Sequence, residues 1–213
     1  MGLYIETLIL YVVLFFTGSI GSGTLPEGFS ISNELWRIFT YSIPALALIW
    51  YLLLKAKKNR EWGIKPGKND LISCIITFPC LFITGFTVSL VSSFIGGTEA
   101  EITLYSPTTA LGWALLCISC IAAAYLEESF FRFYIISRRE DLKLSATYAL
   151  VFSTALFSIC HLYEGPWGFL NAALSGAFLG FIFLRYRAIH GISLAHAMYN
   201  ITVYVINANA GYS

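Results

Sequence analysis

The sequence predicts an all-α integral membrane protein, a bundle of about seven transmembrane helices forming a single membrane domain over residues 1–213. Hydrophobic residues make up 57% of the chain and charged residues only 12%, and the mean hydropathy is +0.72. A water-soluble domain of this size has too little polar surface to cover so much apolar material. The apolar residues also gather in long runs, and most Lys and Arg residues lie in a few short stretches between them.

Crossing the hydrocarbon core takes about 20 mostly apolar residues in a helix. Runs of this kind occupy 4–20, 35–54, 71–95, 108–136, 145–162, 168–186 and 191–208. The first run has no Lys or Arg before it and contains Glu6, so it lacks the basic flank of a secretory signal and is predicted to be a retained helix. No soluble domain, repeat or low-complexity segment fits in the remaining residues.

The basic residues alternate between loops, as expected for correctly placed membrane spans. They follow the second, fourth and sixth runs: Lys55, Lys57, Lys58, Arg60, Lys65, Lys68, Arg138, Arg139, Lys143, Arg185 and Arg187. The opposite loops hold only Arg37, together with Glu27, Glu34, Glu99, Glu101 and Glu164. This pattern predicts a cytoplasmic N-terminus and an exterior C-terminus. The small size and lack of extra domains point to a prokaryotic inner membrane.

The net charge of +1, with the basic residues confined to loops, gives no basic surface for a nucleic-acid partner.

Polar groups inside the late spans are more informative: Glu127, Glu128, Arg132, His161, His196 and Asn200. Such groups are costly in hydrocarbon and indicate a functional site in which each has a partner. Glu128 and Arg132 are four residues apart on one helix face, which predicts a structural ion pair. Glu127 lies about 100° around the helix and is left for chemistry.

His196 and Asn200 are also four residues apart and can present an imidazole and an amide to one point. His161 brings a second imidazole from another helix. Each alone can simply bond a neighbouring helix, but their joint occurrence with two glutamates on three spans predicts one shared site. Counting residues along straight helices from the nearest cytoplasmic charge places Glu127, His161 and His196 at membrane depths that differ by about 10 Å. Helix tilt has to make up this difference. His190 lies among basic residues and is predicted to be a solvated surface histidine.

These residues spell three motifs in order: EExxxR, FxxxH and HxxxN, formed by Glu127, Glu128 and Arg132, by Phe157 and His161, and by His196 and Asn200. In order and spacing they resemble the CPBP family of intramembrane proteases. This family includes the CAAX prenyl endopeptidases of the Ras-converting type and bacterial Abi-like proteins. The resemblance covers residues 108–208, the expected catalytic core, and is specific as a set although each motif alone is weak.

The resemblance implies an intramembrane endopeptidase whose partners are membrane lipids and a peptide or lipidated protein substrate. Glu127 and His161 would position and deprotonate a water, and His196 and Asn200 would stabilise the tetrahedral oxyanion. Glu128, Arg132 and Phe157 would support them. This assignment is chemically coherent, because peptide hydrolysis needs a base near the attacking water and donors where negative charge develops.

The need for a metal stays open at this point. Glu127, His161 and His196 suit Zn²⁺ with a water in the fourth position, and proteins of this family are often labelled metalloproteases. The sequence HExxH is absent, however, and a water held directly by Glu127 and His161 needs no ion. The metal-independent route is favoured over the zinc route.

One departure from the family concerns Phe133, because the family commonly has Gly after the motif arginine. A phenyl ring there is expected to alter helix packing or narrow a substrate groove. Two other functions compete with the peptidase: a peptide-binding or bacteriocin-immunity protein on the same scaffold, and a proton-coupled transporter that uses buried Glu and His as a relay. The inverted repeats that would favour a transporter are not evident in the sequence.

Overall fold

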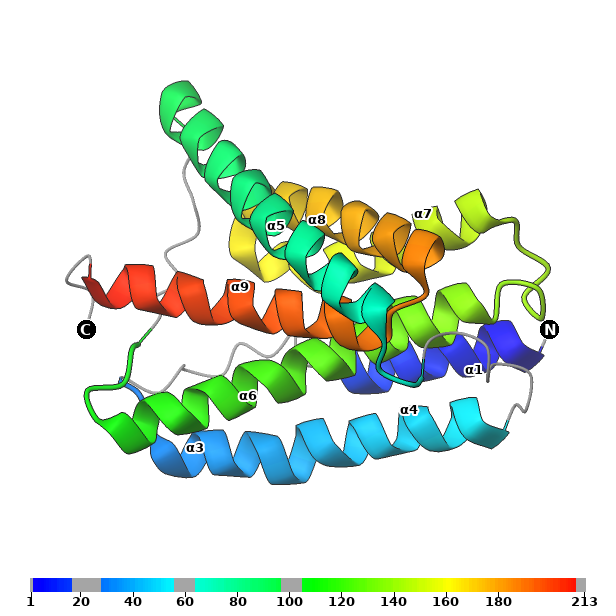
Figure 1. The fold of residues 1–213 in the computed structure, drawn as a ribbon, viewed down its shortest axis with the longest axis horizontal. Helices are drawn as coiled ribbons and strands as arrows, with labels where there is room; N and C mark the ends of the chain where they lie inside the picture. Colours follow the sequence, from blue (N-terminus) through cyan, green and yellow to red (C-terminus); the bar gives the residue numbers. More distant parts are fainter. Residues whose placement is uncertain (1, 17–27, 56–63, 97–104, 210–213) are drawn as a thin grey trace.

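A computed structural model describes residues 2–16, 28–55, 64–96 and 105–209, and all regular secondary structure within these ranges is helical (Figure 1). Glu27, Lys57, Lys58, Arg60, Glu99, Glu101 and the end of the first apolar run, 17–20, lie outside the described residues. The predicted all-α fold class is confirmed. The helices, in chain order, are α1 (Gly2–Tyr11), η1 (Val12–Phe16), α3 (Ile31–Trp36), η2 (Arg37–Ser42), α4 (Ile43–Lys55), α5 (Lys68–Ile95), α6 (Ala110–Glu128), η3 (Ser129–Ile136), α7 (Ala146–Ile159), η4 (Leu162–Glu164), α8 (Gly165–Tyr186) and α9 (Ile189–Asn209).

Local side-chain chemistry sets where several helices begin. Ser30, Thr109 and Ser145 precede α3, α6 and α7, and each side-chain oxygen accepts a hydrogen bond from a backbone N–H in the first turn. Such caps satisfy donors that have no partner inside the helix. At its other end, α5 stops at Gly96, which adopts a left-handed conformation with φ of 71°.

Three segments, η1, η2 and η3, are π-helical and continue α-helices without a break. The π-helix η2 joins α3 to α4, and η3 extends α6, so that Ile31–Lys55 and Ala110–Ile136 are each one continuous helix. Wide turns of this kind are rare and often occur at functional sites. The π-helix η3 begins directly after Glu128, the second glutamate of the EExxxR motif.

Among the described residues, four helices are long and apolar enough to cross a membrane: Ile31–Lys55, Lys68–Ile95, Ala110–Ile136 and Leu162–Tyr186. The expected count of about seven is therefore not confirmed. Gly2–Phe16 and Ala146–Ile159 are shorter apolar helices. The 14-residue α7 is only about 21 Å long at the rise of an α-helix, against a hydrocarbon thickness of about 30 Å. The helix α9 is long enough, but His196 and Asn200 are among the polar residues that make it less apolar.

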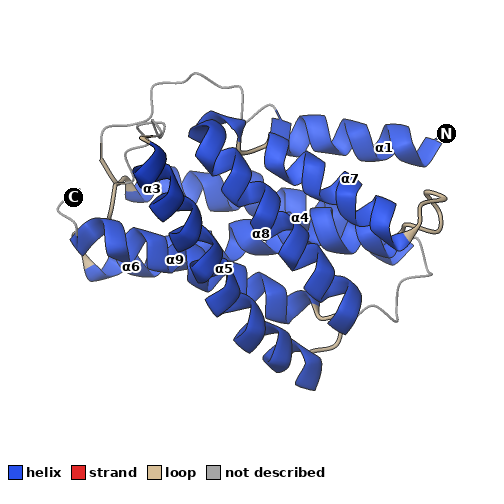
Figure 2. Cartoon of the chain, turned by 90° about the horizontal axis from the view of Figure 1, so that it is seen from above, coloured by secondary structure: helices blue, strands red, loops and turns tan. Residues whose placement is uncertain are grey.

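The helices form a layered bundle in which α6 and α9 lie side by side between α3–α4 on one side and α5, α7 and α8 on the other (Figure 1). Figure 2 shows α5 crossing over α9 and its neighbours at an angle. At this crossing the backbone N–H of Gly191 donates to Asp70 Oδ1 over 2.9 Å. A Cβ atom on Gly191 would lie 2.1 Å from the Asp70 carbonyl oxygen, so only glycine allows this close approach.

The segment η3 lies at the centre of the bundle, where α4, α6, α7, α8 and α9 all contact it. All eight of its residues are buried. The segment η1, which continues α1, also packs here, because the Phe15 ring lies 4.9 Å from Phe130 and 4.8 Å from Phe131 between centroids. In the middle of α1, Glu6 accepts a hydrogen bond from Arg138 over 3.3 Å. The first helix is thus part of the packed structure.

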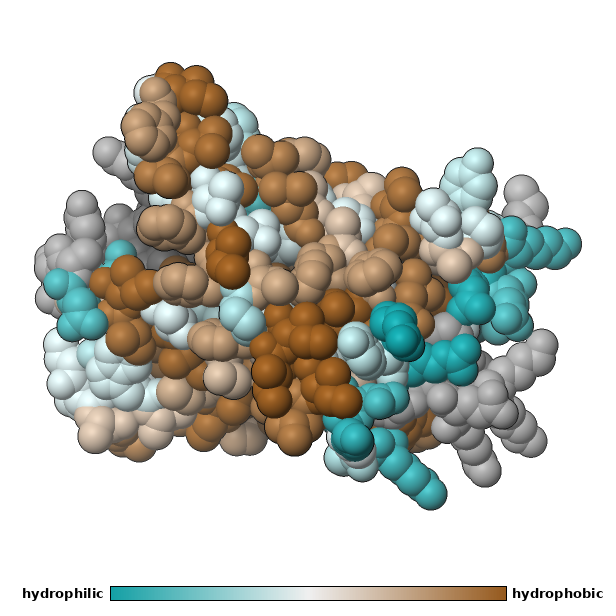
Figure 3. Space-filling view, turned by 45° about the horizontal axis from the view of Figure 1, so that its top comes forward, coloured by the Kyte–Doolittle hydropathy of each residue, from teal (hydrophilic) through white to brown (hydrophobic). Residues whose placement is uncertain are grey.

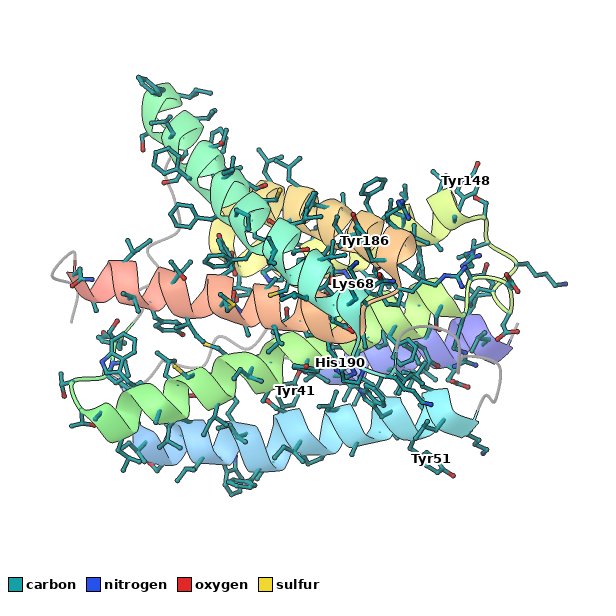
Figure 4. All side chains as sticks on the ribbon, in the orientation of Figure 1. Tyr41, Tyr51, Lys68, Tyr148, Tyr186 and His190 are labelled. Carbon is teal, nitrogen blue, oxygen red and sulfur yellow. The ribbon has the colours of Figure 1, made fainter. Side chains whose placement is uncertain are left out.

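The outer surface supports a membrane environment. Large apolar side chains are exposed on several helices, including Trp36 at 72% and Phe94 at 83%, and large exposed apolar surfaces are rare on soluble monomers. Hydrophilic side chains gather at one end of the face drawn in Figure 3. Tyr51 and Tyr148 project outward near this same end (Figure 4). Tyrosine is enriched where membrane proteins meet the headgroup region.

Candidate active site

Glu128 lies at the end of α6 and is completely buried. Its Oε1 accepts hydrogen bonds from Arg132 Nη1 over 3.0 Å and from His196 Nδ1 over 2.8 Å. The ion pair predicted from the four-residue spacing is therefore present, and it continues to a third group on α9. This carboxylate joins two of the three sequence motifs.

Arg132 is also fully buried and is bonded on more than one side. Its Nη2 donates to the Gly176 carbonyl over 3.2 Å, and the guanidinium carbon lies 4.4 Å from the centroid of the Phe157 ring. A Cβ atom on Gly176 would lie 2.9 Å from Phe157. Glycine in α8 thus allows the helix backbone to approach the arginine closely, and with Gly180 it forms a GxxxG spacing, which favours close helix packing.

The orientation of His196 follows from its partner. Glu128 as a carboxylate only accepts hydrogen bonds, so His196 Nδ1 carries a proton and donates it to Glu128. The other ring nitrogen, Nε2, lies 3.8 Å from Glu127 Oε2. This distance is too long for a direct hydrogen bond and is suited to a bridging water. Glu127 itself is partly accessible, with 25% of its side chain exposed.

His161 follows α7 directly and is held by the backbone of that helix. Its Nδ1 lies 2.8 Å from the Phe157 carbonyl oxygen, and because a carbonyl only accepts, Nδ1 carries the donated proton. A neutral ring then has its lone pair on Nε2, which can accept a proton. The Phe157 ring lies 4.6 Å from the His161 ring and 6.2 Å from the His196 ring between centroids, so it forms an apolar wall between the two.

One cavity of about 430 Å³ is lined by all four residues predicted to be catalytic: Glu127, His161, His196 and Asn200. The structure brings them together from α6, the end of α7, and α9, despite the difference in depth expected from straight helices. Of the three supporting residues, Phe157 also lines the cavity. Glu128 and Arg132 lie behind it, where they hold His196 and Phe157.

Several lining residues were not expected from the sequence: Arg37, Tyr163, Glu164, Asn171, Tyr199 and Tyr204. Arg37 and Glu164 were expected to be loop charges. Instead, Arg37 begins η2 inside a continuous helix, and Glu164 ends the short helix η4. The sequence did contain one signal for Arg37: it is the single basic residue among the loop charges of that side, which are otherwise all glutamates.

The fit of the three expected zinc ligands can be judged from their side chains. Glu127 and His196 approach each other, and His161 lines the same cavity. Within the described ranges, however, no three His, Cys, Asp or Glu side chains are grouped so that they could hold a metal ion. The arrangement in the described residues does not fit a metal with these ligands, and the metal-independent route stays a prediction.

His190 differs from the expected solvated histidine. It lies in the first turn of α9 and is half-buried (Figure 4). Its Nε2 bonds the Ile64 carbonyl over 2.9 Å, and its Nδ1 lies 3.3 Å from the Tyr125 hydroxyl. The ring also stacks on Trp50, with the centroids 6.5 Å apart. His190 was misplaced because sequence proximity to basic residues does not reveal the packing of α4 and α6 around the start of α9.

Phe133, which stands where the family commonly has Gly, points away from the cavity. It is completely buried, with its ring 5.5 Å from Trp50 on α4 and 6.3 Å from Phe183 on α8 between centroids, both in edge-to-face geometry. It is absent from the residues that line the cavity. Phe133 therefore packs between α4 and α8 and does not narrow the cavity.

Replacing Phe133 with leucine is expected to lower the free energy of unfolding by about 1–2 kcal/mol, because the aromatic pairs are lost while most of the volume is kept. Catalytic efficiency should be unchanged, since the side chain does not reach the cavity. Thermal unfolding in detergent and kcat/KM check the two parts. Phe157→Leu is the matched control, because that ring lines the cavity and its replacement should reduce kcat/KM. Equal losses of kcat/KM in both variants would contradict this assignment.

Comparison with known proteins agrees with the motifs. Residues 109–202 match the model of a family described as type II CAAX prenyl endopeptidase Rce1-like. No curated protein and no solved structure matches the chain. The Rce1-like proteins are a peptidase family, and together with the apolar helices the match points to an integral membrane protein. Residues 109–202, which carry all three motifs of the site, are thus similar to the Rce1-like CAAX prenyl endopeptidase family.

Proposed function

We propose that this protein is an intramembrane endopeptidase that hydrolyses a peptide bond of a membrane-associated or lipidated peptide. The observation that supports this function best is that Glu127, His161, His196 and Asn200 line one cavity. They supply the two things that peptide hydrolysis requires, a base for water and donors for the oxyanion. The family match supports a peptidase of the CAAX type.

In the proposed mechanism, a water in the cavity attacks the peptide carbonyl carbon. Glu127 and His161 Nε2 are the bases that take up the proton of the water. The carbonyl oxygen, which becomes negatively charged, accepts hydrogen bonds from the Asn200 amide and from His196 Nε2 when that ring carries both protons. The proton held by the base then moves to the leaving nitrogen as the C–N bond breaks. The products are a carboxylic acid and an amine, and no step requires a metal.

Glu128 has a positioning role in this mechanism. Because it fixes the His196 ring through Nδ1, it directs Nε2 toward Glu127 and the cavity. Arg132 balances the buried charge of Glu128 and packs on Phe157. A fixed imidazole loses little freedom as the transition state forms, which favours its use as a donor at the oxyanion.

The proposed location is the prokaryotic inner membrane, with the N-terminus in the cytoplasm, because the basic residues follow alternate spans. In the structure the N-terminus lies at the same end of the bundle as the end of α4 and the start of α7 (Figure 1). The chain segments next to these ends contain Lys55, Arg138, Arg139 and Lys143.

The function is tested by cleavage of a panel of membrane-anchored fluorogenic peptides by purified protein, with and without a zinc chelator. We expect turnover by the wild type that falls about 100-fold or more in His161→Ala and His196→Ala. The chelator should have no effect. Loss of activity with the chelator, restored by zinc, would contradict the metal-independent mechanism.

Folding of each variant has to be verified by thermal unfolding in the same detergent. His161→Ala cutting as fast as the wild type would remove His161 from the site. Peptide binding without turnover in the wild type would instead favour a non-proteolytic peptide-binding or immunity protein on this scaffold.

A further inference from the structure

Glu164 lines the cavity beside the catalytic groups but has no role in the proposed mechanism. It ends the short helix η4, and its backbone N–H donates to the His161 carbonyl over 3.0 Å. A turn closed by such a hydrogen bond holds the two Cα atoms within about 7 Å of each other. An extended peptide advances about 3.3–3.6 Å per residue. Glu164 therefore lies about one or two peptide residues from the catalytic histidine.

The side chain of Glu164 is folded back over the first turn of α8. A Cβ atom added to Gly168 would lie 2.2 Å from Glu164 Cβ and 2.9 Å from its Oε2, so the glycine leaves the space that this side chain occupies. Glu164 is also the N-cap residue of the 22-residue α8. A negative charge is stabilised at the N-terminus of a helix. Both features keep an ionised carboxylate at the cavity wall.

The carboxylate of Glu164 lacks a counterion in the described part of the chain, where no lysine, arginine or histidine lies at ion-pair distance from it. The described lining residues include a second carboxylate, Glu127, and one arginine, Arg37. Arg37 is already paired with Glu34 over 2.6 Å. With neutral histidines, the cavity therefore has an excess of negative charge, which favours a bound cation and disfavours an anion.

Two further hydrogen-bond acceptors lie on the same wall of the cavity. Asn171 and Ser175 follow Glu164 by seven and eleven residues, which places all three on one face of α8, and both line the cavity. Asn171 Oδ1 and Ser175 Oγ are buried without a hydrogen-bond partner among the described residues, and Ser175 is only 7% exposed. Ammonium and guanidinium groups only donate hydrogen bonds. A cationic ligand would therefore satisfy these oxygens as well as the carboxylate.

The rest of the lining suits an organic cation with a long apolar stem. Tyr163, Tyr199 and Tyr204 line the cavity, and Leu81 and Leu179 add apolar surface. The faces of aromatic rings attract ammonium and guanidinium groups. Lysine and arginine place their aliphatic stems along apolar surface while the charged end reaches a polar group. The cavity therefore fits a basic side chain better than a small inorganic cation.

We propose that Glu164 binds a lysine or arginine side chain of the substrate, about one or two residues from the scissile bond, and thereby selects basic peptides. This inference rests on the proposed peptidase function. The carboxylate accepts charge-assisted hydrogen bonds from the ammonium or guanidinium group, and Asn171 and Ser175 accept from its remaining N–H groups. The ammonium at the N-terminus of a peptide has the same chemistry, so the test has to separate the two sources.

The test starts from a membrane-anchored fluorogenic peptide that the wild type cuts. N-acylated versions have lysine or norleucine at each of the two positions on either side of the cut, and one further norleucine peptide has a free N-terminal amine. The quantity compared is the ratio of kcat/KM for the lysine peptide to kcat/KM for the norleucine peptide. Because both values come from one protein sample, this ratio does not depend on the folded fraction of a variant.

We expect a ratio of about ten or more at one of these positions in the wild type. The control Glu140→Gln, which changes an 83% exposed loop carboxylate, should keep it. In Glu164→Gln the ratio should fall to about one, and in Glu164→Lys below one. Gly168→Ala should also lower the ratio, because its Cβ atom displaces the carboxylate without changing the charge, and it should have no further effect on the ratio in Glu164→Gln.

Three results would overturn the role of Glu164 while leaving the peptidase intact. The first is a ratio of one at all positions in the wild type. The second is an unchanged ratio in Glu164→Gln. The third is a preference for the free N-terminal amine in place of the lysine side chain, which would assign the cation site to the end of the peptide.

A binding measurement covers the case in which no peptide is cut. Thermal unfolding of Glu127→Gln is followed with the lysine and the norleucine peptides, with and without Glu164→Gln in the same chain. An increase in Tm with the lysine peptides that disappears in the double variant supports the cation site even if the proposed peptidase function fails. Equal shifts with both kinds of peptide, or no shift with either, would overturn it.

Discussion

Replacing Glu127 with glutamine is expected to lower kcat by roughly 10²–10⁴-fold, the usual contribution of a general base. The substitution keeps the size and the polarity of the side chain but removes its ability to take a proton from water. Stability should change by less than about 0.5 kcal/mol, as for surface substitutions in general, because Glu127 is partly exposed and its nearest charged partner, His196, lies 3.8 Å away. Single-turnover cleavage of the anchored peptide measures this effect directly.

Glu140→Gln is the control for this experiment. Its side chain is 83% exposed and belongs to a loop pair with Arg139, so the same chemical change is made far from the cavity. It should retain the wild-type rate. A fully active Glu127→Gln would exclude this carboxylate as the base and would leave His161 as the remaining candidate.

Replacing Arg132 with methionine is expected to lower the free energy of unfolding by about 3–5 kcal/mol, the usual cost of removing one partner of a buried ion pair. The guanidinium is completely buried, and its removal leaves the carboxylate of Glu128 without its arginine partner. The Gly176 carbonyl loses its donor as well, and Phe157 loses the cation over its ring. Thermal and denaturant unfolding in detergent measure the loss.

The double variant Glu128→Gln with Arg132→Met is the informative comparison. It contains no unpaired buried charge, so it should be more stable than Arg132→Met alone. The glutamine oxygen can still accept from His196 Nδ1, so part of the activity should return together with the stability. If both variants unfold like the wild type, the buried pair does not stabilise the fold and Glu128 serves His196 alone.

Much of the site could be predicted from the sequence because helix periodicity is a local property. The spacing of Glu128 and Arg132 predicted their contact, and the ion pair is present. The spacing of His196 and Asn200 placed both on one face of a helix, and both line the cavity. These relations depend on about 3.6 residues per turn and not on the rest of the fold.

Contacts between helices could not be obtained in this way. The sequence separated Glu128 from the catalytic groups, whereas the structure connects it to His196 across two helices. Arg37 was grouped with the loop charges although it lies at the start of the predicted run 35–54, and it lines the cavity. Nothing in the local sequence indicates that η2 packs against α6 at Ser119.

By itself, the sequence determined the helical class, the apolar character and the polar residues that cannot remain unpaired in a membrane, because these depend on composition and on neighbouring residues in the chain. Only the tertiary structure decided which helices are long enough to cross the membrane, that Arg37 lines the cavity, and which ring nitrogen of His196 is directed to the cavity. The physical reason is that these properties depend on the packing of α6, α7 and α9 around η3. That packing is set by the combined burial of side chains far apart in the sequence.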